Sequence, residues 1–117
     1  MGNLYHKDIY LPPGVLALTD REITFRVTEH ARRAAREDRY GFIAIPASIT
    51  FEGADVIEAE FEAGQLQKLV VRKPYDNRRD AIFVFNVDGT LKTVWANLKS
   101  DCHASLKKEL YKAAPSV

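Results

Sequence analysis

The pair Asp88-Gly89 constrains the fold of this chain more than any other feature of its sequence. It stands between two runs of largely apolar residues, 81–87 and 90–96. Asp-Gly between such runs is the strongest short-range signal for a β-hairpin, because both turn positions need a residue that tolerates a positive φ. The sequence therefore predicts an antiparallel pair in which Phe83 faces Val94 and Ile82 faces Trp95.

A second hairpin is predicted in the segment before it. Apolar residues alternate there with glutamates, so one face of the strand is apolar and the other acidic. We expect the three-residue loop 63–65, because it pairs Ile57 with Val71 and Ala59 with Leu69 and so keeps like faces together.

Two helices and several shorter strands are predicted around these hairpins. Thr28 is an N-cap for a helix over residues 29–38, whose alanines share one face. A final helix is expected over residues 102–113. Short strands are expected over residues 5–11, 23–27, 42–45 and 48–51. The predicted fold class is α+β: a single domain, residues 1–117, with a single antiparallel β-sheet meander, one helix packed before it and one C-terminal helix.

The charge balance argues against avid, sequence-blind binding of nucleic acid. The chain has 17 Lys and Arg and 16 Asp and Glu, which gives a formal net charge of +1. Such binding depends on a large excess of basic residues. The composition therefore leaves room for a local basic site only.

The sequence also predicts a cytoplasmic protein with no membrane partner. The single cysteine, Cys102, cannot form an internal disulfide, which favours a reducing compartment. Residues 1–10 include His6, Lys7 and Asp8 and lack the apolar core of a signal peptide. No apolar run has the length needed to span a membrane.

No metal or cofactor is predicted. The histidines, His6, His30 and His103, are not spaced with other ligands as a metal site requires, and one cysteine excludes thiolate clusters. Cys102 and His103 are adjacent, but neighbours on a helix point about 100° apart, so adjacency does not make a nucleophile and its base.

Basic residues gather on the predicted sheet. Lys68 and Arg72 are four apart on one strand and hence on the same face. Glu60 is the expected cross-strand partner of Lys68. The loop that follows adds Arg78 and Arg79. These charges suit either an anion-binding site or plain cross-strand ion pairing.

Further candidates lie on the last strand and the first helix. Thr93 and Trp95 share one face of the last strand, where an indole can stack on a base or a partner's side chain, or pack in the core. His103 follows in the polar run after that strand. His30 flanks the alanine face of the helix, whose arginines either contact phosphates or form a solvated face balanced by glutamates.

One segment of the chain resembles a known group of proteins. The motif Thr-Glu-His-Ala at residues 28–31, with Arg32 and Arg36, precedes an antiparallel meander that closes on Thr-Val-Trp at residues 93–95. This pattern resembles small RelE-type toxins and the wider barnase and colicin ribonuclease fold. The chain also resembles small proteins encoded by tailed bacteriophages and prophages. The resemblance covers residues 23–97, and its motifs are short.

The resemblance implies a helical layer on one face of the sheet and an RNA groove on the other. Basic residues there stabilise the phosphate, and a His, Tyr or Lys moves protons. Lys68 and Arg72 fit the phosphate role and His103 the general acid, while Trp95 is placed to stack on a base. The first hypothesis is therefore a toxin-like, metal-independent endoribonuclease or an RNA-binding domain, with RNA as its partner.

The alternative hypothesis is a non-enzymatic, phage-encoded protein that binds a host protein and inhibits or adapts it. The acidic strand and the basic loop suit charge-complementary docking. A third possibility is an assembly role through an exposed strand edge. Convergence of the candidate residues in a cleft favours the enzyme, whereas a flat surface of split sign favours the binding protein.

Overall fold

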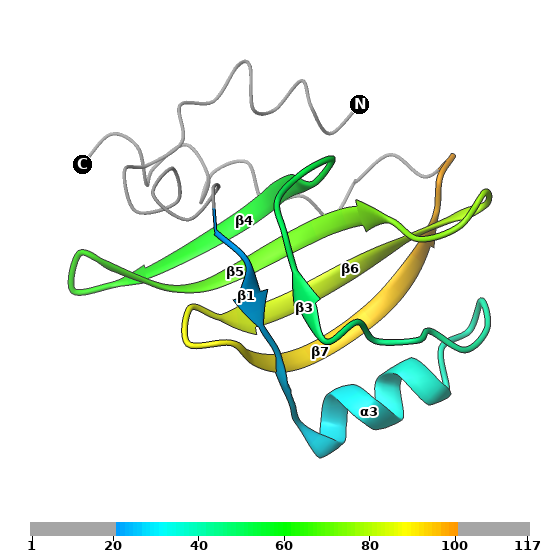
Figure 1. Ribbon diagram of the computed structural model, residues 1–117, viewed down its shortest axis with the longest axis horizontal. Helices are drawn as coiled ribbons and strands as arrows, with labels where there is room; N and C mark the ends of the chain where they lie inside the picture. Colours follow the sequence, from blue (N-terminus) through cyan, green and yellow to red (C-terminus); the bar gives the residue numbers. More distant parts are fainter. Residues whose placement is uncertain (1–20, 101–117) are drawn as a thin grey trace.

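The computed structural model describes residues 21–100. The predicted strand 5–11 and the predicted C-terminal helix, with Cys102 and His103, lie outside these residues. The described elements (Figure 1) are, in chain order, β1 (Ile23–Thr24), β2 (Arg26–Val27), α3 (Glu29–Arg36), β3 (Ser48–Ile49), β4 (Asp55–Glu62), β5 (Gln65–Pro74), β6 (Arg79–Asn86) and β7 (Thr90–Leu98).

Strands β4 to β7 form an antiparallel meander, as predicted. They belong to a five-stranded sheet of order β2-β7-β6-β5-β4, in which β2 pairs with β7 in parallel. Strands β1 and β3 pair in a separate two-stranded antiparallel sheet. The α+β class is confirmed, whereas the prediction of a single antiparallel sheet is wrong, because the large sheet is mixed and a second sheet is present.

Phe25 accounts for the difference from the predicted strand 23–27. Its buried ring lies 5.7 Å from that of Phe83 and 5.4 Å from that of Phe85, measured between centroids. Its amide donates at 2.8 Å to the carbonyl of Ala47, a residue just before β3, and not to β7, with which the following residues pair. One buried aromatic residue thus divides the segment into two short strands with different partners.

The Asp88-Gly89 hairpin forms with the predicted register. Phe83 lies opposite Val94, and Ile82 lies opposite Trp95. Gly89 has a φ of 99°, a value that side-chain-bearing residues rarely adopt. The turn chemistry of the sequence was therefore sufficient to predict this pairing.

The turn between β4 and β5 is shorter than predicted. It consists of two residues, Ala63 and Gly64, with φ values of 53° and 79°. A register shift near the end of β4 compensates for the missing loop residue, so that Ala59 still lies opposite Leu69 as predicted. A bulge thus corrects the register that a two-residue loop alone would impose.

A second register shift changes the start of β4. Val71 pairs with Val56, so the predicted pairing of Val71 with Ile57 is wrong. Ile57 instead belongs to a small buried cluster with Val70, Ile82 and Val84. These side chains alternate with those that pack toward α3, and we call their side of the sheet the second face.

Helix α3 covers the other face of the sheet, against β7 (Figure 1). Thr28 caps it as predicted, because its hydroxyl oxygen accepts from the amide of Ala31 at 3.0 Å. Ala31 and Ala35 are buried in the main core, and the helix ends at Arg36.

Of the strands predicted over 42–45 and 48–51, only β3 forms. Within residues 21–100, no helix has the length and the hydropathy of a membrane-spanning segment.

Candidate functional site

The structure brings four predicted site residues to the second face. Lys68 and Arg72 come from β5, while Thr93 and Trp95 come from β7. Arg72 and Trp95 both lie opposite Ile82 of the intervening strand β6, so the three form one row across the sheet. The Trp95 residue is 37% exposed, which leaves its indole accessible.

Lys68 and Arg72 nevertheless diverge along β5. Four strand residues span about 13 Å, so these two cations start far apart. The Nζ of Lys68 lies 3.1 Å from Oε1 of Glu60, its predicted cross-strand partner. The Nε of Arg72 donates at 2.6 Å to Oδ2 of Asp80, which lies opposite Pro74 and therefore on the side of Arg72 that is away from Lys68. The two side chains therefore do not converge on one anion.

Arg72 belongs to a buried ion-pair network. Its side chain is 8% exposed, and its Nη2 also donates to the carbonyl of Leu98 at 3.2 Å. Lys99 places its Nζ 2.7 Å from Oδ1 of Asp80. Burial raises the pKa of Asp80, but hydrogen bonds from Lys99 and Arg72 outweigh it and hold that pKa below its ordinary value. These contacts tie β5 and β6 to the end of β7.

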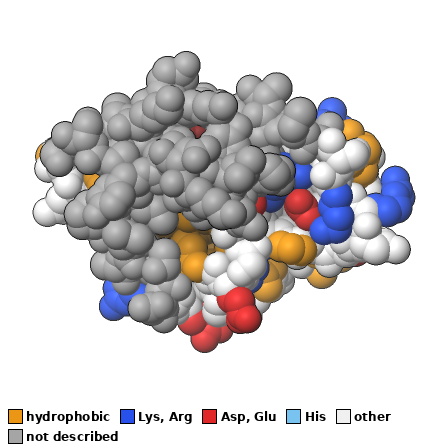
Figure 2. All heavy atoms as spheres, turned by 90° about the horizontal axis from the view of Figure 1, so that it is seen from above, with side chains coloured by type: hydrophobic (Ala, Val, Ile, Leu, Met, Phe, Trp, Pro, Cys, Tyr) orange, Lys and Arg blue, Asp and Glu red, His pale blue; other side chains and the backbone are white. Residues whose placement is uncertain are grey.

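Of the two cations predicted after β5, Arg79 begins β6 and has partners in the turn before it, whereas Arg78 is exposed in that turn and donates its amide to Asp76. Arg79 donates from Nε to Oδ2 of Asp76 at 2.9 Å and lies 4.8 Å from the centre of the Tyr75 ring. The hydrogen bond from the Arg79 side chain, followed by that from the Arg78 amide, lowers the pKa of Asp76 to about 2. Basic side chains gather at this end of the molecule with acidic ones among them (Figure 2).

Arg79 also holds a loop on the helix side of the sheet. Its Nη1 donates to the carbonyls of Tyr40, Gly41 and Phe42 at 3.1, 3.1 and 3.3 Å. His30 is exposed on α3, on that same side. Neither residue therefore joins the second face, and the general acid predicted at His103 lies outside the described residues.

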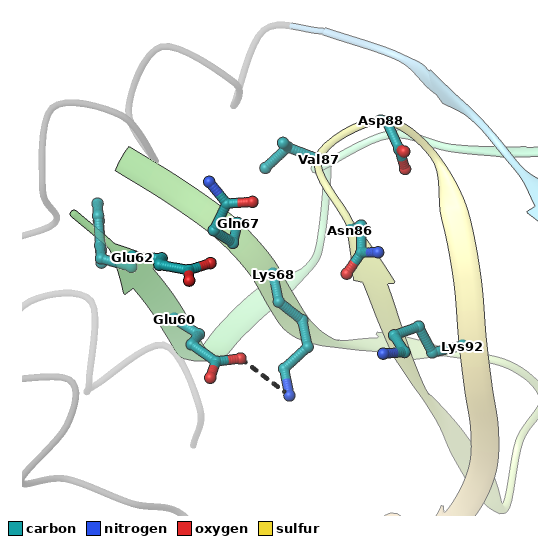
Figure 3. Close-up of a pocket in the computed structure, with 9 residues that line it drawn as sticks. Glu60, Glu62, Gln67, Lys68, Asn86, Val87, Asp88 and Lys92 are labelled. Atoms are coloured by element: carbon teal, nitrogen blue, oxygen red, sulfur yellow. Dashed lines mark ion pairs between the residues drawn. The ribbon is translucent and has the colours of Figure 1, made fainter. Parts of the chain in front are cut away.

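An open cavity of about 710 Å³ lies where the two hairpins end, and we call it the hairpin groove. Lys68 of β5, Asn86 of β6 and Lys92 of β7 point toward it from three adjacent strands (Figure 3). The described residues that line it are Glu60, Phe61, Glu62, Gln67, Lys68, Asn86, Val87, Asp88 and Lys92.

The groove carries both signs of charge. Its described lining includes two ammonium groups and three carboxylates, and Glu60 and Lys68 already form an ion pair. Asp88 accepts from the amide of Thr90 at 2.9 Å and lies 3.6 Å from Nη2 of Arg26. The bonds from Thr90, reinforced by Arg26, lower the pKa of Asp88 below its ordinary value. Asp88 is therefore a fixed negative charge at the rim.

Sequence reasoning missed Lys92 because strict alternation gives a wrong direction. Lys92 and Val94 are two apart, which would place both on the apolar face. Val84 pairs with Thr93 and Phe85 with Leu91, so Lys92 is the extra residue of a bulge and is exposed. A charged residue in an otherwise apolar strand position was the available signal for this bulge.

The arrangement is suited to recognition by hydrogen bonds and charge. No group of three or more His, Cys, Asp or Glu within residues 21–100 could hold a metal ion.

Comparisons with protein-family models, with curated proteins and with solved structures find no match to the chain.

Proposed function

We propose that this protein is a non-catalytic binding protein whose partner is a protein segment that docks in the hairpin groove. The observation that carries this proposal is the mixed sign of the groove, in which two ammonium groups and three carboxylates border one open space. Complementary charges of both signs give a protein interface its specificity and its rate of association.

The charge of the groove disfavours a polyphosphate ligand. Lys68 is already paired with Glu60, which leaves Lys92 as the other cation of the described lining, and Glu62 and Asp88 add two further carboxylates to that lining. Binding of nucleic acid draws its affinity from an excess of cations over phosphates. The toxin-like endoribonuclease would also need Lys68 and Arg72 to act on one phosphate, and their partners draw them apart. These observations favour the protein-binding alternative.

A polypeptide offers what the groove can use. It carries side chains of both signs, and its backbone provides donors and acceptors for the side-chain amides of Gln67 and Asn86. Phe61 and Val87 add apolar surface to the same lining. Polar groups with direct hydrogen bonds form the rim of a non-obligate protein interface, and the groove has the groups for such a rim.

The proposal is tested with a library of random displayed peptides, selected on the full-length protein. We expect selected peptides to carry both acidic and basic residues. Lys92→Glu should weaken their binding by about tenfold or more, measured by fluorescence anisotropy, because it places another carboxylate in the groove. Arg33→Glu on α3 is the matched control, since it changes the net charge equally at an exposed position away from the groove.

A labelled single-stranded RNA is measured in the same buffer. Protein binding through the groove predicts that RNA binds more weakly than the selected peptides. Equal losses in the Lys92→Glu and Arg33→Glu variants would contradict the proposal, as would tighter binding of RNA. Cleavage of the RNA by the purified protein would restore the endoribonuclease hypothesis.

A further inference from the structure

A second candidate surface lies on the opposite side of the sheet from the hairpin groove. A cavity of about 230 Å³ opens between α3 and the chain that follows it. Aliphatic side chains dominate its described lining, which consists of Val27, Arg32, Ala35, Phe42, Ile43 and Ile45. We call it the Phe42 pocket.

Phe42 is held in an exposed position by its neighbours. It is 63% exposed, the highest value among the large hydrophobic residues described. The next residue, Ile43, is 1% exposed and donates its amide to the carbonyl of Ala35 at 3.0 Å. The carbonyl of Phe42 accepts from Nη1 of Arg79 at 3.3 Å. The backbone on both sides of Phe42 is therefore fixed, which reduces the entropy lost when a partner covers it.

Among residues 21–100, the arginines in and next to this pocket have a single carboxylate within 4 Å. Arg32 lines the pocket, and this carboxylate, that of Glu29, lies 3.9 Å away with both side chains largely exposed. Arg36 lies one helical turn further on the same face of α3, and no ion pair of its side chain is found within residues 21–100. Arg39 follows, its guanidinium 4.7 Å from the centre of the Tyr40 ring.

The two acidic residues at the end of α3, Glu37 and Asp38, do not lie next to Arg36 as free partners: Asp38 is hydrogen-bonded, and Glu37 lies nearer to Arg33. Asp38 accepts from the amides of Tyr40 and Ala96, at 3.0 and 2.9 Å. Glu37 follows Arg33 by four residues and so lies near that side of the helix rather than near Arg36. The charged residue of the described lining is therefore the cation Arg32, with Arg36 next to it on the helix, and the other lining residues are apolar.

We propose that the Phe42 pocket is a second docking surface, which takes an acidic protein segment through one apolar side chain. The apolar side chain fills the pocket against Phe42, and flanking carboxylates of the segment meet Arg32 and Arg36. Aromatic and arginine side chains are the residues that most often dominate the binding energy of protein interfaces. An RNA base is disfavoured, because Arg32 is the one side chain of the described lining that can hydrogen-bond to its edges.

The test uses a fluorescein-labelled peptide in which Leu and Phe alternate with Glu and Asp, titrated with the full-length protein at low and high salt. A second peptide has Ser in place of Leu and Phe, and a third has Lys in place of the acids. We expect only the first to bind, and its affinity to fall with added salt. Phe42→Ser and Arg36→Glu should each weaken it by about tenfold.

Two controls make the result specific to this pocket. Arg33→Glu, exposed on the same helix and outside the described lining of the pocket, should weaken binding less than Arg36→Glu does, and Lys92→Glu in the hairpin groove should leave the affinity nearly unchanged. Thermal unfolding of each variant shows that the fold is retained. The proposal is overturned if the first peptide does not bind, if the Ser peptide binds equally, or if Arg33→Glu is as damaging as Arg36→Glu. Tighter binding of a labelled single-stranded RNA at this surface would overturn it too.

Discussion

Replacing Gly89 by alanine tests the way in which β1 and β2 attach to the hairpin of β6 and β7. A Cβ at position 89 would lie 2.2 Å from the carbonyl oxygen of Thr24 and 3.8 Å from Cγ2 of Ile23. The first distance is far below any real contact and involves backbone, so a side chain cannot simply rotate away. Gly89→Ala therefore requires the chain near β1 to move.

The cost has three parts. A non-glycine residue at a φ of 99° costs about 1–2 kcal/mol in backbone strain. Displacement of the chain weakens the bond from the Arg26 amide to the Gly89 carbonyl, now 2.8 Å, a loss of about 1 kcal/mol. Partial exposure of the buried Ile23 adds roughly 1 kcal/mol. We expect Gly89→Ala to lower the free energy of unfolding by about 3 kcal/mol or more.

Gly64→Ala is the matched control, because Gly64 has a φ of 79° and nothing lies within 4 Å of its added Cβ. It should lose only the strain, about 1–2 kcal/mol. Urea unfolding, followed by circular dichroism, gives both values. With a fall of about 4 °C in Tm per kcal/mol, the two variants should also separate clearly on heating. Equal losses in the two variants would refute the close approach of Gly89 and Thr24.

Two further results are expected from the ion pairs. Arg72→Met should lower the free energy of unfolding by about 3 kcal/mol, because it removes one of the two ion-pair partners of the largely buried Asp80. Lys99→Met removes the more exposed partner of the same carboxylate and should lower it by less than about 1 kcal/mol. Chemical unfolding of the two variants compares these values. Because the pKa of Asp76 is lowered to about 2, its pairing with Arg79 stabilises the fold fully above about pH 4 and is lost as the pH falls toward 2. Asp76→Asn should therefore flatten the fall of Tm over this range, and an unchanged slope would contradict the pairing.

Features that depend on neighbours along the chain could be predicted from the amino-acid sequence. Asp88-Gly89 determined its hairpin and the pairing of Phe83 with Val94, because the turn requires positive φ and the strands require alternation. Thr28 determined where α3 begins, since its hydroxyl replaces a carbonyl that the first turn lacks. The pairing of Lys68 with Glu60 followed from the same alternation.

Other features depend on contacts between residues far apart in the chain, so they became visible only in the folded molecule. The rings of Phe83 and Phe85 bury Phe25 and so divide one expected strand into β1 and β2. The bulge in β7 turns Lys92 from the expected apolar face into the hairpin groove.

For Arg72, in the candidate site, the sequence predicts the face of the sheet but not the ion-pair partner. The sequence places it on the same face as Lys68, and the structure confirms that placement. Its guanidinium has charged groups within reach on several elements, and the spacing along β5 says nothing about which one it binds. The packing of β6 against β5 brings Asp80 within 2.6 Å, and burial of the pair strengthens their attraction. Periodicity thus determines which face a side chain occupies, whereas the distance and burial of its partners are properties of the assembled sheet.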